Sequence, residues 1–119
     1  MSVKLTTRQK GDVIIVDASG KLTLGEGTST LRTKIRELVA GGSRRFVLNL
    51  ADVTYMDSSG LGELIGAHTT IVTAGGEMKL LNLAKRVHDL LKVTKLYTVF
   101  EVFEDEASAV DSFKVAKAD

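Results

Sequence analysis

The chain has 119 residues, 44% of them hydrophobic, which suffices for one domain whose core needs no metal ion or disulfide. Sixteen Lys and Arg residues against fifteen Asp and Glu residues give a formal net charge of +1, a balance that excludes a general nucleic-acid or membrane-surface binder. Cysteine is absent and no apolar run is long enough for a signal peptide or membrane span, so we expect a cytoplasmic protein without disulfides or thiolate zinc sites.

The first part of the chain predicts a hairpin followed by a helix. Residues 3–9 alternate loosely and residues 13–16 are apolar, so the short turn between them predicts two antiparallel strands. Three glycines predict a loop over residues 20–27. Apolar residues at helical spacing predict a helix from about Thr28 to Ala40, which Gly41-Gly42 ends.

The rest of the chain continues to alternate strands with helices. The expected elements are a strand over 46–50, a helix from Ser58 to about Gly75 whose apolar stripe includes Leu61, His68 and Val72, a strand over 78–83, a short helix around Leu90, an edge strand over 98–103 and a helix over 104–113 with Ala107, Val110 and Phe113 on its apolar face. The predicted fold class is α/β, in the order ββαβαβαβα, with a mixed sheet of four to five strands and helices packed against it. We expect a single domain over residues 3–113 and a frayed tail over 114–119.

The most informative stretch is residues 57–62, with the sequence DSSGLG. It places a carboxylate and two hydroxyls at the start of a helix, where free backbone N–H groups and the helix dipole favour negative charge, so the site can receive a phosphate. The same residues could also be an ordinary helix cap. Gly60 and Gly62 are poor helix formers, and we interpret them as room for a docking protein, with Leu61 as an apolar knob between them.

Enzymatic readings of this stretch fail. Neither Ser58 nor Ser59 has glycines two residues before and after it, as a nucleophile elbow requires. The only histidines are His68, about 15 Å along the helix axis from Ser58, and His88, in a charged stretch, so neither is placed to act as the base. His68 is interpreted as a core-edge side chain, since Val72 at i+4 supplies no second metal ligand. No phosphate-binding glycine motif is complete, and we expect no catalytic residue, cofactor or metal.

Residues 53–62, VTYMDSSGLG, closely resemble the signature of the bacterial anti-sigma factor antagonists of the STAS domain family, and the elements agree in order and length over about residues 3–113. The resemblance implies a STAS-type fold and a protein that is not an enzyme. It implies that the unphosphorylated form binds a serine kinase that is also an anti-sigma factor, which releases the sigma factor. Phosphorylation of Ser58 would abolish binding, and a serine phosphatase would restore it.

The implied partner-binding residues are Asp57, Ser58, Ser59, Gly60, Leu61 and Gly62, together with Lys21, Leu22 and Thr23. Two residues depart from the family pattern: many antagonists have Asp at the positions of Thr23 and Asn49, and both departures would remove negative charge from the neighbourhood of Ser58. Ser59 remains an alternative phosphoacceptor. We expect a monomer or weak dimer. The alternative function is a non-switching STAS subunit of a stress-signalling or transport complex.

Overall fold

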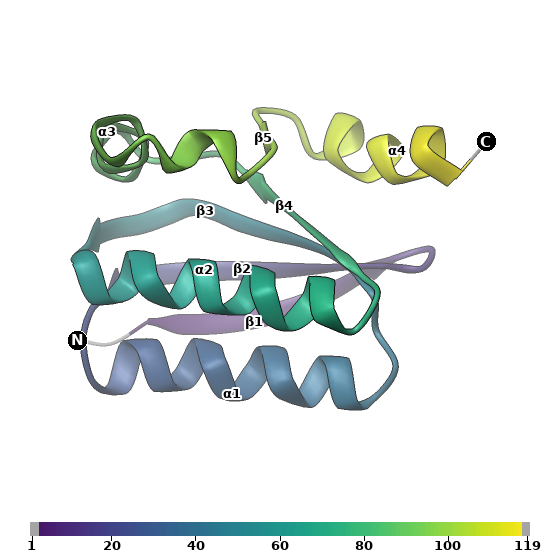
Figure 1. The fold of residues 1–119 in the computed structure, drawn as a ribbon, viewed down its shortest axis with the longest axis horizontal. Helices are drawn as coiled ribbons and strands as arrows, with labels where there is room; N and C mark the ends of the chain where they lie inside the picture. The colour runs from purple at the N-terminus through teal and green to yellow at the C-terminus, as the bar shows by residue number, and fades with distance from the viewer. Residues whose placement is uncertain (1–2, 118–119) are drawn as a thin grey trace.

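A computed structural model describes residues 3–117 of the chain and places them around one five-stranded sheet (Figure 1). The strands are β1 (Lys4–Lys10), β2 (Val13–Leu22), β3 (Arg45–Met56), β4 (Glu77–Leu81) and β5 (Val102–Phe103). The helices are α1 (Glu26–Ala40), α2 (Ser58–Thr73), α3 (Lys85–Thr94), the 3-10 helix η1 (Leu96–Thr98) and α4 (Glu106–Lys117). The predicted order ββαβαβαβα is confirmed, with η1 as an addition.

The sheet is mixed, and its strands lie in chain order from β1 to β5. β1 pairs antiparallel with β2 across a turn in which Gly11 takes a φ of 63°, a conformation that glycine adopts without strain. Every other pair is parallel, as expected when a helix separates consecutive strands. The carboxyl ends of β2 and β3 therefore meet at one end of the sheet.

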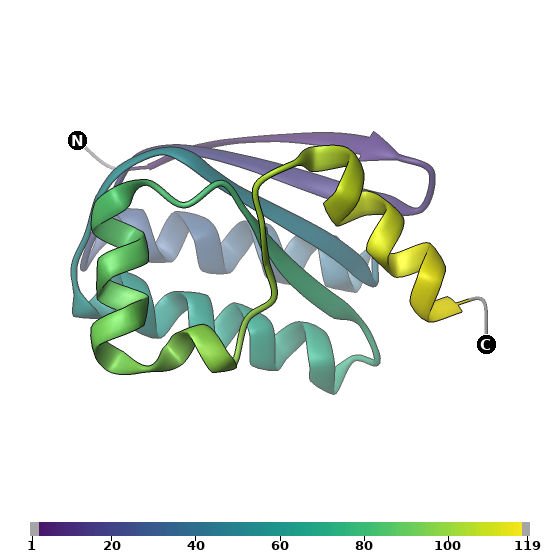
Figure 2. The same ribbon diagram turned by 90° about the horizontal axis from the view of Figure 1, so that it is seen from above.

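Two layers of helices cover the sheet. α1 and α2 lie side by side along one face, and α4 lies on the other side (Figure 1). Viewed from above, α3 and α4 lie toward opposite ends of the molecule, joined by the segment that holds η1 and β5 (Figure 2). The larger apolar core packs α1, α2 and α3 against the sheet through residues such as Leu31, Leu64 and Val87. A smaller core packs Ala109 and Phe113 of α4 on the opposite face.

β2 and β3 are both longer than the sequence predicts. β2 continues to Leu22 and β3 to Met56, so the prediction of a loop from residue 20 and of a strand end at residue 50 is wrong. The reason is irregular pairing, since the register between the two strands shifts after Asp17 and again after Gly20, which interrupts the alternation that marks a strand. The extension places Leu22 directly beside Met56.

The C-terminal elements also differ in detail. β5 is an edge strand as predicted but has only two residues, because η1 occupies its expected start and the side chain of Phe100 is buried in the larger core. In α4, Ala109 takes the buried place predicted for Ala107, which is exposed, and the helix runs on to Lys117. Val72 of α2 is exposed, although the sequence predicts it on the apolar stripe. Residues 118–119 of the expected tail lie outside the described residues.

Candidate functional site

The DSSGLG stretch lies where β3 ends and α2 begins, next to the end of β2 (Figure 1). Asp57 has extended backbone geometry and is the N-cap of α2. Its Oδ1 accepts a hydrogen bond from the Gly60 N–H at 2.8 Å, and its Oδ2 accepts one from the Leu24 N–H at 3.1 Å. These bonds, that of Gly60 first, hold the pKa of the Asp57 carboxyl below its ordinary value. The ionised carboxylate therefore ties the loop before α1 to the first turn of α2.

Because Asp57 provides the cap, the two serine hydroxyls are not needed for it. Ser58 is the first residue of α2 and is exposed, whereas Ser59 is half-buried. Within residues 3–117, neither hydroxyl has a hydrogen-bond partner. The start of α2 offers backbone N–H groups and the positive end of the helix dipole, so it is suited to an added phosphate.

The two glycines of the first turns have different roles. A Cβ on Gly60 would lie 2.1 Å from the Leu22 carbonyl oxygen and 2.8 Å from Met56 Cγ. The interpretation that Gly60 leaves room for another protein is therefore wrong, because the chain's own β2 fills that space. A Cβ on Gly62 would meet nothing within 4 Å, and Gly62 is exposed. Only Gly62 fits the interpretation of an open surface.

The apolar side chains near Ser58 also differ from the prediction. The Leu61 side chain is only 6% exposed and belongs to the larger core, so the prediction that it forms a surface knob is wrong. Leu22 is buried in the same core, and its carbonyl oxygen accepts the Asp57 N–H at 3.4 Å. Leu24, which the sequence analysis did not single out, is 76% exposed. The only sequence signal for it is its position: a leucine in a loop, directly before Gly25.

Two basic side chains flank the same end of the sheet. Lys21 is exposed and pairs in register with Tyr55 of β3, so their side chains share one face of the sheet. The Arg86 guanidinium of α3 lies over the Tyr55 ring, 5.9 Å from its centroid. Thr23 is half-buried, and its carbonyl oxygen accepts the Thr28 N–H. The structure thus brings Lys21 and Thr23 close to Asp57 as expected, and adds Tyr55 and Arg86, which the sequence analysis missed.

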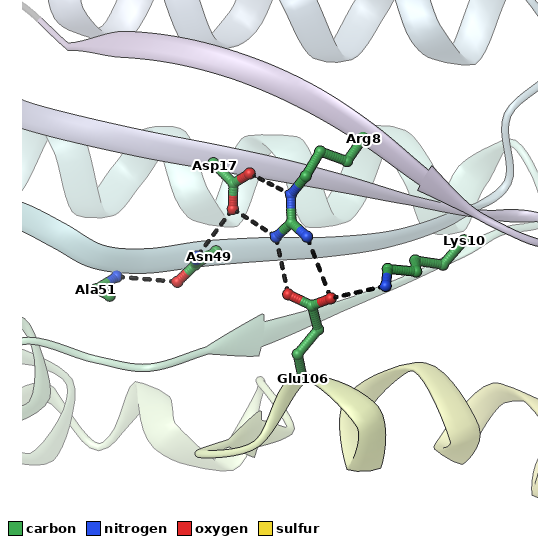
Figure 3. Close-up of polar contacts among 6 residues, drawn as sticks. All are labelled: Arg8, Lys10, Asp17, Asn49, Ala51 and Glu106. Carbon is green, nitrogen blue, oxygen red and sulfur yellow. Dashed lines mark hydrogen bonds and ion pairs between the residues drawn. The ribbon is translucent and has the colours of Figure 1, made fainter.

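Asn49 does not belong to this site. It lies seven residues before Met56 on β3, about 23 Å away along the strand. Its Nδ2 donates to Asp17 at 2.8 Å, and Asp17 and Glu106 are both bound by the Arg8 guanidinium (Figure 3). The prediction that Asn49 alters the charge around Ser58 is therefore wrong. Arg8 lowers the pKa of both carboxyls, and this cluster joins β1 and β2 to α4 as a structural contact.

Among residues 3–117, no hydrogen bond links either histidine to Ser58 or Ser59. His68 is half-buried and packs edge-on against Phe100, with ring centroids 5.4 Å apart, while His88 is exposed on α3. Among the described residues no group of three or more His, Asp or Glu side chains is placed to hold a metal ion. No helix within residues 3–117 has the length and apolar character to cross a membrane.

Comparison with known proteins places the chain in a family. Its sequence matches the STAS domain family over residues 4–109. The chain belongs to the STAS domain family. Two relatives of this STAS domain are the anti-sigma F factor antagonist of Paenibacillus polymyxa, 28% identical over 97% of this chain and 98% of that protein, and the anti-sigma-B factor antagonist of Bacillus subtilis strain 168, 30% identical over 86% and 92%.

Solved structures agree with the STAS fold. The anti-sigma factor antagonist SpoIIAA in its unphosphorylated form superposes with a TM-score of 0.79 at 20% identity, covering 93% of this chain and 96% of that one. The phosphorylated form of SpoIIAA superposes with a TM-score of 0.72 at 20% identity, covering 92% and 99%. At this identity the likeness shows the fold alone. It confirms the predicted fold class, and the family match confirms the resemblance drawn from residues 53–62.

Proposed function

We propose that this STAS domain is an anti-sigma factor antagonist that Ser58 phosphorylation switches off. Its unphosphorylated form binds a cytoplasmic serine kinase that is also an anti-sigma factor, and the sigma factor is released. A serine phosphatase returns the phosphorylated form to the binding state, and the antagonist itself catalyses nothing. The names of the two relatives, each matched over more than 85% of both chains, support this class of function.

The exposure of the Ser58 hydroxyl at the start of α2 is the observation that supports Ser58 as the phosphoacceptor. Asp57 alone caps α2, so the exposed Ser58 hydroxyl stands at the helix start without a structural task. Ser59 has the same chemistry but is half-buried, and a kinase must bring its nucleotide to the acceptor oxygen. Ser58 is therefore the preferred acceptor and Ser59 the alternative.

The switch acts mainly on the partner. A phosphate adds about −1.5 to −2 charge at neutral pH. The N-terminus of α2 favours that charge, whereas the negative charge of the neighbouring Asp57 disfavours it. These two effects on the fold oppose one another, so we expect the fold to stay the same. A partner surface shaped for a neutral hydroxyl instead meets a bulky dianion. A loss of about 3 kcal/mol at that contact weakens binding by roughly 150-fold.

Intact-mass spectrometry after incubation with ATP and the anti-sigma kinase purified from the native host tests the acceptor. The wild-type protein is expected to gain one phosphate, Ser58→Ala to gain none, and the matched control Ser59→Ala to behave as wild type. If Ser58→Ala is phosphorylated to the same stoichiometry and Ser59→Ala is not, the acceptor is Ser59. If no variant gains phosphate, the proposed switch is wrong.

A further inference from the structure

We propose that Leu24 is the apolar anchor of the docking surface, and that it fits a partner surface in which an apolar pocket is bordered by carboxylates. This inference rests on the proposed function and names the chemistry that its partner presents. It concerns residues outside the DSSGLG stretch: Leu24 in the loop before α1, with Lys21 and Arg86 on either side of Tyr55.

Leu24 is both exposed and fixed. A large apolar side chain that is 76% exposed gains free energy when a partner covers it, in proportion to the apolar area removed from water. The backbone N–H of Leu24 donates to Asp57 Oδ2 at 3.1 Å, while Oδ1 of the same carboxylate caps α2 through Gly60. The Asp57 carboxylate therefore holds the Leu24 backbone in place relative to Ser58, which directly follows Asp57 in the chain. Because the backbone of Leu24 is held in this way, less backbone entropy is lost on binding.

The charged side chains near Leu24 indicate the sign of the charge on the partner surface. Within the described part of the chain, Lys21 and Arg86 are exposed and have no carboxylate partner. Both lie next to Tyr55, which pairs with Lys21 in the sheet and lies under the Arg86 guanidinium. Of the acids in this neighbourhood, Asp57 has both oxygens engaged by N–H groups and Asp89 is paired with Lys85, while Glu26 is exposed two residues after Leu24. The two unpaired cations at Tyr55 complement a partner whose apolar pocket is bordered by carboxylates on that side.

The same arrangement gives phosphorylation a second effect. A dianion on Ser58 lies at the end of the sheet that holds Lys21, so it partly neutralises the field that attracts an acidic partner. Phosphate would then weaken binding by repelling the partner's carboxylates as well as by steric conflict. The salt dependence of binding separates these contributions, because only the electrostatic one is screened.

Isothermal titration of wild-type and variant antagonists with the anti-sigma kinase purified from the native host tests the anchor. Leu24→Ala is expected to weaken binding at least about 10-fold, the effect of leaving one leucine-sized contact unmade. The matched control is Val72→Ala, because Val72 is 49% exposed near the end of α2, about 21 Å along the helix axis from Ser58. Equal melting temperatures of the variants show that neither change acts through the fold.

A double variant that removes both cations tests whether the partner surface is negatively charged. The double variant Lys21→Ala with Arg86→Ala is expected to weaken binding at low salt and to flatten its salt dependence. The control removes two other exposed cations, Arg36 of α1 and Arg44 just before β3, which lie toward the opposite end of the sheet, and is expected to keep the salt dependence of wild type.

Each outcome decides a different claim. If wild type binds and Leu24→Ala binds within twofold of it, or if Val72→Ala is weakened as much, Leu24 is not the anchor. If the control cation pair changes the salt dependence as much as the Lys21 and Arg86 pair, the attraction is not local to this surface. If wild type itself does not bind the kinase, the proposed function is overturned, and this inference with it.

Discussion

Gly60→Ala adds one methyl group at the most crowded point of the site. The new Cβ would lie 2.1 Å from the Leu22 carbonyl oxygen, whereas ordinary contact begins at 3.4 Å, so β2 and α2 must separate by about 1.3 Å at this point. That movement also strains the hydrogen bond from the Asp57 N–H to the same oxygen. Overpacking of this kind costs roughly 1–3 kcal/mol or more, and the better helix propensity of Ala returns up to about 1 kcal/mol.

We therefore expect Gly60→Ala to lower the free energy of unfolding by about 2 kcal/mol. The matched control is Gly62→Ala, in the same helix turn, whose Cβ meets nothing within 4 Å and which should raise the free energy of unfolding by up to about 1 kcal/mol. Equilibrium unfolding in urea measures both. Equal stability of the two variants would refute the conclusion that Gly60 is required by the chain's own packing.

Two further predictions concern the ionic contacts. Arg8→Ala removes the guanidinium that joins two carboxylates in Figure 3 and should lower the free energy of unfolding by about 1 kcal/mol in urea, while Arg36→Ala, an exposed arginine of α1, should change it by less than about 0.5 kcal/mol. A loss no larger than that of the control would contradict a structural role for the cluster. Because the folded-state pKa of Asp57 is lowered, its contribution to stability is present above its unfolded-state pKa and is lost as pH falls through the folded value. The amide resonances of Gly60 and Leu24 should shift together in an NMR titration with a midpoint below the ordinary pKa of an Asp side chain, and a midpoint at or above that ordinary pKa would show that these N–H groups do not hold the carboxylate.

The order of elements can be predicted from the sequence because each helix has apolar residues at helical spacing and a glycine pair marks two of the helix ends. The ends of β2 and β3 cannot be predicted in this way. Their last residues pair with one another across shifts in register. The backbone pairing that defines these residues as strand therefore forms only when β2 and β3 lie side by side in the folded protein. The two-residue β5 shows the converse, since its alternation is visible in the sequence but Phe100 is drawn into the larger core.

The candidate site shows the same division. The DSSGLG stretch can be recognised because a cap, a hydroxyl pair and a helix start are all local features. The roles of its neighbours depend on tertiary contacts. Gly60 faces Leu22, which is 38 positions earlier, and Arg86 reaches Tyr55 from another helix. Exposure decides the rest, because Leu61 and Leu24 look alike in the sequence and only one of them is buried.

The central claim is that a neutral Ser58 is required for docking. Protein carrying phosphoserine at position 58 and unmodified protein can be titrated separately, by calorimetry, into the anti-sigma kinase purified from the native host. We expect the phosphorylated form to bind roughly 100-fold or more weakly, while its melting temperature stays close to that of the unmodified form. Equal affinities of the two forms would contradict it.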